Sequence, residues 1–176
     1  SARVSFTGSR SYELSVPAAC GEALWRRCVE LGQVLGVEPV GLEATMRLRL
    51  EKGYLHIGAD TDGTTYPQDI GYATATANKP GDVIGRRSTM LPEAVRPGRR
   101  QLVGIEPLVA EQEIFAGSHV VKANCSSDGW VTSAGYSLAL GRYVALGMVS
   151  DGRARIGETI TLHSLGLRSK SRLSAP

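Results

Sequence analysis

Cysteine is scarce in this chain, and its pattern excludes a scaffold held together by disulfides. The three cysteines, Cys20, Cys28 and Cys125, form no CxxC pair. An odd and sparse count is typical of a reducing compartment such as the cytoplasm. Cys28 lies in an apolar helical pattern, so we expect it to be buried as a small apolar residue. All three cysteines are predicted to be free thiols.

Long hydrophobic runs and a strong charge of one sign are also absent. No apolar run approaches the roughly 18 residues that a membrane-spanning helix needs, and no basic segment followed by an apolar one marks a signal peptide. The net charge is only +3, from 20 basic and 17 acidic side chains, whereas nucleic-acid-binding domains concentrate basic residues on one face. We therefore expect neither a membrane nor a nucleic acid as a partner.

The first half of the sequence contains one extended pattern and two helical ones. Residues 3–17 alternate apolar and polar side chains around a Thr-Gly-Ser turn, which predicts a β-hairpin. Apolar residues recur at helical spacing over 19–36, and residues 42–53 read as a second helix that Gly53 can end in a left-handed cap. Residues 54–58 are predicted to form a short strand.

The second half contains strand and turn patterns only. A basic stretch with two prolines, residues 85–101, is interpreted as the link between two units. After it, short apolar stretches separated by glycine turns predict a small antiparallel barrel, and the chain as a whole is α+β. We interpret Arg168, Lys170 and Arg172 as a solvated strand edge that discourages edge-to-edge pairing.

An acidic loop follows the second predicted helix and is tested first as a metal site. An EF-hand loop needs a glycine at its sixth position and a glutamate at its twelfth. Counting from Asp60, the glycine is the fourth residue, Gly63, and the twelfth residue is Gly71. The three histidines have no ligand spacing either: His56, His119 and His163. No metal site is predicted, and Asp60 is expected to hydrogen-bond the backbone of the loop.

Glu13 allows two interpretations. It lies on the polar side of a strand whose other side carries Tyr12, Leu14 and Val16. Strand carboxylates are usually solvated. Alternatively, a carboxylate on a rigid strand can accept two hydrogen bonds from the adjacent amino and ring N–H groups of a pterin. The local pattern does not decide between them.

Several longer stretches resemble one protein family. They occur in the same order as in the aminomethyltransferase family, whose founding member is the T-protein of the glycine cleavage system. The resemblance covers nearly the whole chain, and it is strongest for the branch that contains the C-terminal region of the sarcosine oxidase alpha subunit. The stretches are "RVSFTGSRSYELSVP", "GLEATMRLRLEKGYLHIGADTDGTTYPQDIGY", "KPGDVIGRRS", "RRQLVGIEP", "GWVTSAGYSLALGRYVALGMV" and "ARIGETITL".

The resemblance implies a fold and a division into two domains. Residues 1–90 would be the last part of an α/β folate-binding domain, and residues 98–176 the small antiparallel β-barrel that follows it in the family. Because the chain opens within a predicted strand at Ser1, we expect it to be a fragment of a longer polypeptide.

The resemblance also assigns roles to individual residues. The family motif Thr-Gly-Glu-x-Gly-aromatic-Glu matches residues 7–13, and its final glutamate, which contacts the pterin ring of tetrahydrofolate, falls on Glu13. Tyr12 occupies the aromatic position and is a second candidate for folate contact. Ser9 and Ser11 replace the earlier glutamate and the second glycine, so the turn is expected to differ in shape.

One further position separates this chain from the T-protein. T-proteins carry a folate-contacting arginine where this chain has Thr45, and threonine lacks the paired donors of a guanidinium. In the acidic loop, Asp60, Thr65 and Pro67 match the family pattern and are expected to order the loop. The catalytic aspartate of the family belongs to a region before Ser1, so no catalytic residue is predicted here.

The function implied by the resemblance belongs to a larger enzyme. A sarcosine oxidase alpha-like subunit would pass the N-methyl carbon of sarcosine to tetrahydrofolate, with FAD, FMN and NAD bound elsewhere in the enzyme and other subunits as partners. The expected location is the cytoplasm. Two alternatives stay open: a non-catalytic module kept for subunit packing, and a flavin-free tetrahydrofolate-dependent aminomethyl or methyl transferase.

Overall fold

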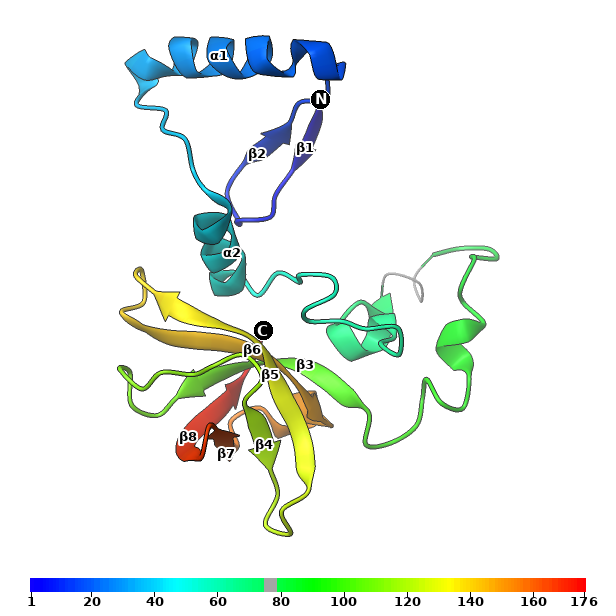
Figure 1. The fold of residues 1–176 in the computed structure, drawn as a ribbon. Coiled ribbons are helices and arrows are strands. Elements are labelled where there is room, and N and C mark those ends of the chain that lie inside the picture. Colours follow the sequence, from blue (N-terminus) through cyan, green and yellow to red (C-terminus); the bar gives the residue numbers. More distant parts are fainter. Residues whose placement is uncertain (75–78) are drawn as a thin grey trace.

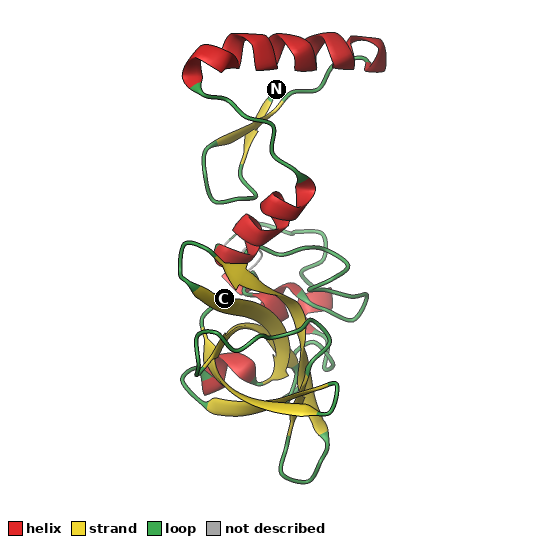
Figure 2. Cartoon of the chain, turned by 60° about the vertical axis from the view of Figure 1, so that its left-hand side comes forward, coloured by secondary structure: helices red, strands yellow, loops and turns green. Residues whose placement is uncertain are grey.

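A computed structural model describes residues 1–74 and 79–176, and it places a hairpin and a long helix apart from a β-barrel. In Figures 1 and 2 a second, shorter helix stands between the two parts. The elements before the barrel are β1 (Ala2–Val4), β2 (Ser11–Glu13), α1 (Gly21–Gly32) and α2 (Leu42–Glu51), with short 3₁₀ turns at Ala18–Cys20, Gln33–Leu35, Pro67–Ile70 and Ser88–Met90. Within the described ranges no helix is long and apolar enough to cross a membrane.

The predicted hairpin and both predicted helices are confirmed. Strands β1 and β2 pair antiparallel, with Val4 opposite Ser11, and α1 is extended by a 3₁₀ turn at each end. The apolar stripe of α1 is exposed, however: Trp25 is 57% and Leu31 55% accessible. The prediction that Cys28 is a core residue is therefore wrong, since its thiol is exposed.

The predicted strand over residues 54–58 is also wrong. Its backbone donors are used locally: the Tyr54 N–H donates to the Arg49 carbonyl, and the His56 N–H donates to the Asp60 carboxylate. Only a single bridge between Ile57 and Thr61 remains of a strand-like contact. The alternation of apolar residues is real, but in the part of the chain that the structure describes no strand pairs with this segment.

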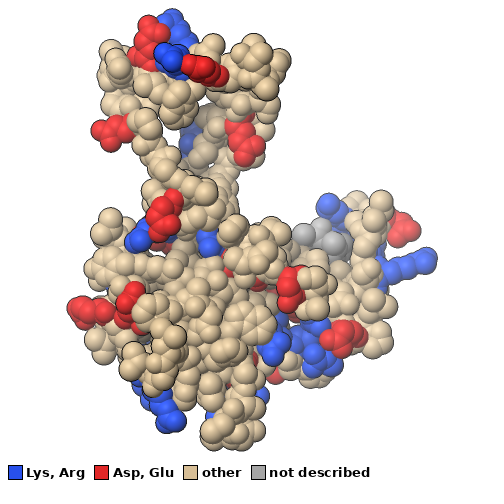
Figure 3. All heavy atoms as spheres, in the orientation of Figure 1, with Lys and Arg blue, Asp and Glu red and all other residues tan. Residues whose placement is uncertain are grey.

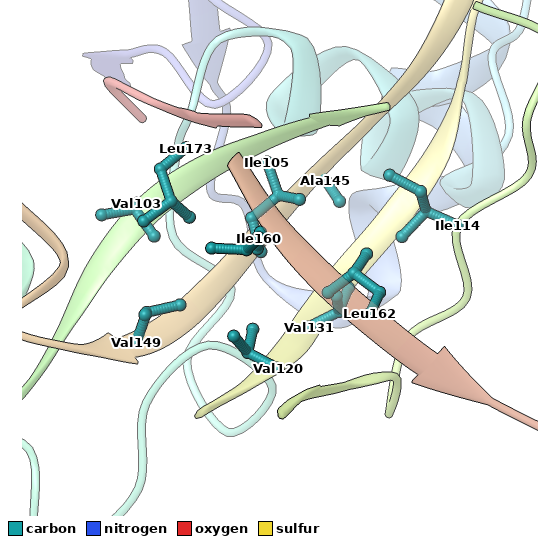
Figure 4. Close-up of a cluster of buried hydrophobic side chains, with 10 residues drawn as sticks. All are labelled: Val103, Ile105, Ile114, Val120, Val131, Ala145, Val149, Ile160, Leu162 and Leu173. Atoms are coloured by element: carbon teal, nitrogen blue, oxygen red, sulfur yellow. The ribbon is translucent and has the colours of Figure 1, made fainter. Parts of the chain in front are cut away.

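The predicted barrel is confirmed. Six antiparallel strands close in the order β3-β6-β5-β4-β7-β8. Side chains from these strands meet inside the barrel, where Val103, Ile105, Val131 and Val149 are fully buried (Figure 4). The strands are β3 (Arg100–Pro107), β4 (His119–Val121), β5 (Ser127–Ser137), β6 (Arg142–Ser150), β7 (Thr159–Ser164) and β8 (Leu167–Ser174), and a 3₁₀ turn, Gly152–Arg155, lies between β6 and β7.

Closure of the barrel corrects one further prediction. Strand β8 pairs with β3 on one side and with β7 on the other, so it has no free edge. Arg168, Lys170 and Arg172 are exposed as expected, but protection of an edge does not explain them.

A second apolar cluster joins α2 to the outside of the barrel. Leu50 of α2 packs with Leu102, Leu146 and Met148 of the barrel strands. This contact fixes the C-terminal end of α2 on the barrel, whereas the hairpin and α1 project beyond it (Figure 2).

Candidate functional site

Glu13 lies on the hairpin, open to solvent. It is the last residue of β2 and pairs with Ala2 across the hairpin. Its side chain forms no hydrogen bond or ion pair with the described residues, and Tyr12, beside it, is 61% exposed. Adjacent strand residues point to opposite faces, so the two candidates do not share one face of β2. The carboxylate is free to accept donors from a ligand, but the described chain does not enclose it.

The turn before Glu13 is ordered by hydroxyl groups and by one glycine. The Thr7 and Ser9 hydroxyls are 2.8 Å apart, and the Ser11 hydroxyl donates to the Ser9 carbonyl. Gly8 has a φ of +85°, and a side chain at this position would collide with Lys52 at the end of α2. The serines that depart from the family motif thus hold a turn that rests against α2.

The Thr45 side chain hydrogen-bonds to the backbone of its own helix. Its hydroxyl donates to the Gly41 carbonyl at 3.3 Å, the back-bond that threonine commonly forms in helices. No guanidinium is available at this position.

Asp60 is at the centre of a buried network. It is 1% exposed and accepts hydrogen bonds from Arg49 Nη1 at 2.6 Å, the His56 N–H at 2.8 Å and the Ser133 hydroxyl at 2.7 Å. The Thr132 hydroxyl is a fourth donor. Arg49 is also buried and donates to Ser133 at 2.7 Å. The network therefore joins α2, the acidic loop and strand β5.

Thr65 and Pro67 lie in the next turn of the same loop. The Thr65 hydroxyl accepts from the Asp62 N–H and donates to the Asp62 carboxylate. Hydrogen bonds from the Thr64 hydroxyl and N–H are the main reason that the pKa of Asp62 lies below its usual value. Pro67 begins a 3₁₀ turn, where a missing N–H leaves no hydrogen bond unmade. These bonds support the proposal that Asp60, Thr65 and Pro67 order the loop.

A second ion pair ties the loop to the start of the barrel. Asp69 is 2% exposed and accepts from Arg99 Nη2 at 2.6 Å, and the same guanidinium reaches Glu93 at 3.0 Å. Its pairing with Asp69 raises the pKa of Arg99. Sequence reasoning did not find this pair because the two residues lie in separate segments and follow no motif.

A hollow of about 1050 Å³ lies between the acidic loop, the linker and the barrel. Asp62, Arg96 and Trp130 line it, as does Arg100, whose guanidinium lies 4.7 Å from the centre of the Trp130 ring. Glu13 is not part of it. In the described residues no group of three or more histidine, cysteine, aspartate or glutamate side chains is placed to hold a metal ion.

The free cysteines give a direct check of the described arrangement. All three are exposed and unpaired, and eight helical positions separate Cys20 from Cys28 by about 12 Å, beyond disulfide reach. We expect three thiols to react in a thiol count under denaturing, non-reducing conditions. A count below three would contradict this arrangement.

The architecture defines the class of protein: a hairpin and two helices leading into a closed six-stranded barrel. Residues 1–79 match the family described as GCVT N-terminal domain, and residues 100–176 match the glycine cleavage T-protein C-terminal barrel domain. The chain belongs to the aminomethyltransferase, or glycine cleavage T-protein, family.

Individual relatives agree with this assignment. The chain is 37% identical to a sarcosine oxidase subunit alpha of Rhizobium meliloti over 96% of its length, and 36% identical to one of Corynebacterium sp. (strain U-96) over 90%. It is 32% identical to an aminomethyltransferase of Halothermothrix orenii over 91% of its length. The crystal structure of the aminomethyltransferase T of the Bartonella henselae glycine cleavage system superposes with a TM-score of 0.79 at 25% identity and 98% coverage of this chain.

The relatives are longer than this chain. It spans 17% of each of the two sarcosine oxidase alpha subunits, 44% of the Halothermothrix orenii protein and 47% of the Bartonella henselae chain.

Proposed function

We propose that this chain is the C-terminal folate-binding region of a sarcosine oxidase alpha-like subunit. The observation that carries the proposal is the identity of 36–37% to two sarcosine oxidase alpha subunits over at least 90% of the chain, compared with 27–34% for five aminomethyltransferases. Thr45 in the place of the T-protein arginine supports the same branch. Residues 1–90 would complete the folate-binding domain and residues 98–176 form the barrel, a division supported by the family matches at 1–79 and 100–176.

Glu13 is proposed to anchor the pterin. Its carboxylate has no partner in the described chain, so both oxygens can accept the paired N–H donors of the ring. Charge-assisted bonds of this kind are strong only where water is excluded. The rest of the N-terminal domain, which the longer relatives have room for, would supply that enclosure. Tyr12 stays a second candidate for contact with the folate.

The reaction belongs to the larger enzyme. We propose that the N-methyl carbon of sarcosine is oxidised with the help of FAD, FMN and NAD bound outside this chain and is captured on tetrahydrofolate as 5,10-methylenetetrahydrofolate. This chain would hold the folate and contribute no catalytic residue, other subunits would complete the enzyme, and the cytoplasm would be its location.

Product analysis on the full protein and its partner subunits tests the proposal. With sarcosine and tetrahydrofolate we expect 5,10-methylenetetrahydrofolate, and without tetrahydrofolate we expect free formaldehyde. Folate-dependent transfer in a preparation without flavin would favour the transferase alternative. If tetrahydrofolate changes neither the rate nor the product of sarcosine turnover and no folate binds, the result would favour a packing module.

The isolated chain of residues 1–176 is expected to bind folate weakly. A hydrogen bond exchanged with water is worth only about 1 kcal/mol net, and Glu13 is exposed. Calorimetric titration with folinic acid should therefore give a dissociation constant of roughly 1 mM. Micromolar binding by these residues alone would contradict the proposal that further polypeptide closes the site.

A further inference from the structure

The turn between β7 and β8 places a leucine where leucine is disfavoured. Two residues, Leu165 and Gly166, connect the strands, and their φ angles are +48° and +79°. Positive φ at both central positions is the pattern of a type I′ turn, which favours Asn-Gly, Asp-Gly or Gly-Gly. A leucine side chain crowds the backbone in this conformation. Leu165 is also 90% exposed, so neither local conformation nor burial accounts for it.

A further apolar side chain is exposed beside β8. Leu108 is 47% exposed; Leu167, the first residue of β8, is 70% exposed but lies on the strand face opposite that of Arg168. The Leu108 N–H donates to the Lys170 carbonyl at 3.1 Å, so the loop after β3 lies directly beside β8. Grouped apolar exposure of this kind marks interaction surfaces in soluble proteins.

Three cations continue the surface along β8. Arg168, Lys170 and Arg172 alternate with Ser171 and Leu173, which are buried in the barrel. The cations therefore share the outer face at a spacing of about 7 Å. Figure 3 shows basic side chains at the lower left of the barrel, where Figure 1 places β8.

None of the three cations has a hydrogen bond or ion pair within the part of the chain that the structure describes. Glu106 lies opposite Arg172 across the β3–β8 pair, but its carboxylate is paired with Arg142 at 3.2 Å. Neighbouring β7 offers Thr161 and His163 to Lys170 and Arg168, and no carboxylate. Like charges at this distance repel each other when unpaired, and β8 is not an edge strand that they could protect.

We propose that this surface docks a segment of a second protein that carries both carboxylates and apolar side chains. The β8 patch consists of Leu108, Leu165, Arg168, Lys170 and Arg172. Carboxylates of the partner would pair with the three cations, and its apolar side chains would cover the leucines, which matches the mixed composition of protein–protein interfaces. The proposal does not depend on folate binding or on sarcosine as the substrate.

The geometry favours a protein over a membrane or a nucleic acid. The cations run along the strand away from the leucine turn, so a membrane that received Leu165 would leave Arg172 about 17 Å or more away, beyond the Debye length of about 8 Å at physiological salt. The positive face is also one strand wide, whereas a nucleic acid needs a broader one.

The first experiment measures stability in the full protein. Leu165→Asn is expected to raise the unfolding temperature by about 2–4 °C, because asparagine suits the turn. Leu138→Asn is the matched control: Leu138 is 86% exposed in the turn between β5 and β6, without a positive φ. It should shift the unfolding temperature by less than about 1 °C. Equal shifts of the unfolding temperature in both variants would contradict the inference that leucine is unfavourable for the turn conformation at position 165.

The second experiment measures binding. A fluorescein-labelled decapeptide of alternating glutamate and leucine is titrated in an anisotropy assay at two salt concentrations. The variant Arg168→Gln/Lys170→Gln/Arg172→Gln should bind about tenfold more weakly and lose most of the salt dependence. Leu165→Asn should bind about threefold more weakly although it is more stable. The control Arg26→Gln/Arg27→Gln/Arg87→Gln removes the same charge elsewhere and should stay within about twofold of the unmodified protein.

Circular dichroism establishes that each variant is folded, and Lys170→Glu alone provides a second test if the triple variant is not. Unchanged peptide affinity in the β8 variants would overturn the proposal. So would tighter binding of anionic lipid vesicles or duplex DNA than of the peptide, if the same variants abolish it, because the surface would then serve another class of partner.

Discussion

Replacing Asp60 with alanine should lower the free energy of unfolding by about 3–5 kcal/mol, because it leaves Arg49 buried without its partner. Four donors converge on the Asp60 carboxylate, from α2, the loop backbone and strand β5. The substitution would also leave the Ser133 hydroxyl without its acceptor next to an uncompensated charge, whereas the Thr132 hydroxyl keeps the Leu146 carbonyl as a second acceptor. Urea unfolding followed by circular dichroism measures the loss.

Asp62→Asn is the matched control for this prediction. Asp62 lies in the same loop, and its carboxylate accepts hydrogen bonds from Thr64 and Thr65 at the surface. Its replacement should cost less than about 1 kcal/mol. A second comparison replaces both partners, Arg49→Met with Asp60→Leu, and should be much less damaging than Asp60→Ala, since no charge is left buried. A loss below about 1 kcal/mol for Asp60→Ala would mean that the network does not hold α2 on the barrel.

Glu13→Ala should weaken tetrahydrofolate binding by about 2–4 kcal/mol, or roughly 30-fold to 900-fold, in the full protein. The substitution removes a carboxylate proposed to accept two donors of the pterin. Stability should hardly change, because Glu13 is exposed and unpaired in the described chain. Calorimetry with folinic acid gives the affinity, and thermal unfolding without ligand gives the stability.

Glu13→Gln separates the charge of this side chain from its shape. Glutamine keeps the size and one acceptor oxygen but presents an NH₂ group to a pterin donor. It should bind folate more tightly than the alanine variant and more weakly than the unmodified protein. Unchanged folate affinity in both variants would show that Glu13 does not contact the folate. A large loss of stability would point instead to a structural role of the hairpin.

Some of the structure follows from local sequence pattern. The hairpin, both helices and the strands of the barrel were predicted because the periodicity of their apolar residues is a property of the chain itself. The left-handed stop at Gly53, with a φ of +69°, was also predicted, because glycine adopts a positive φ without the steric cost that other residues have. Glu13 as a candidate came from a motif seven residues long, and no tertiary contact was needed to name it.

The rest depended on contacts between distant segments. Residues 54–58 alternate like a strand, but Asp60 and Arg49 take their backbone bonds, and Asp60 is held in turn by Thr132 and Ser133, more than seventy positions away. Cys28 has the spacing of a core residue, and only the folded chain shows that its thiol is exposed.

The sequence predicted a strand edge at Arg168, Lys170 and Arg172, because no local pattern shows whether the barrel closes. Pairing of β8 with both β3 and β7 removes the edge. Periodicity thus determined which elements form, because it records which side of each element is apolar. Tertiary structure decided what each side meets, since burial and pairing depend on segments that no local pattern brings together.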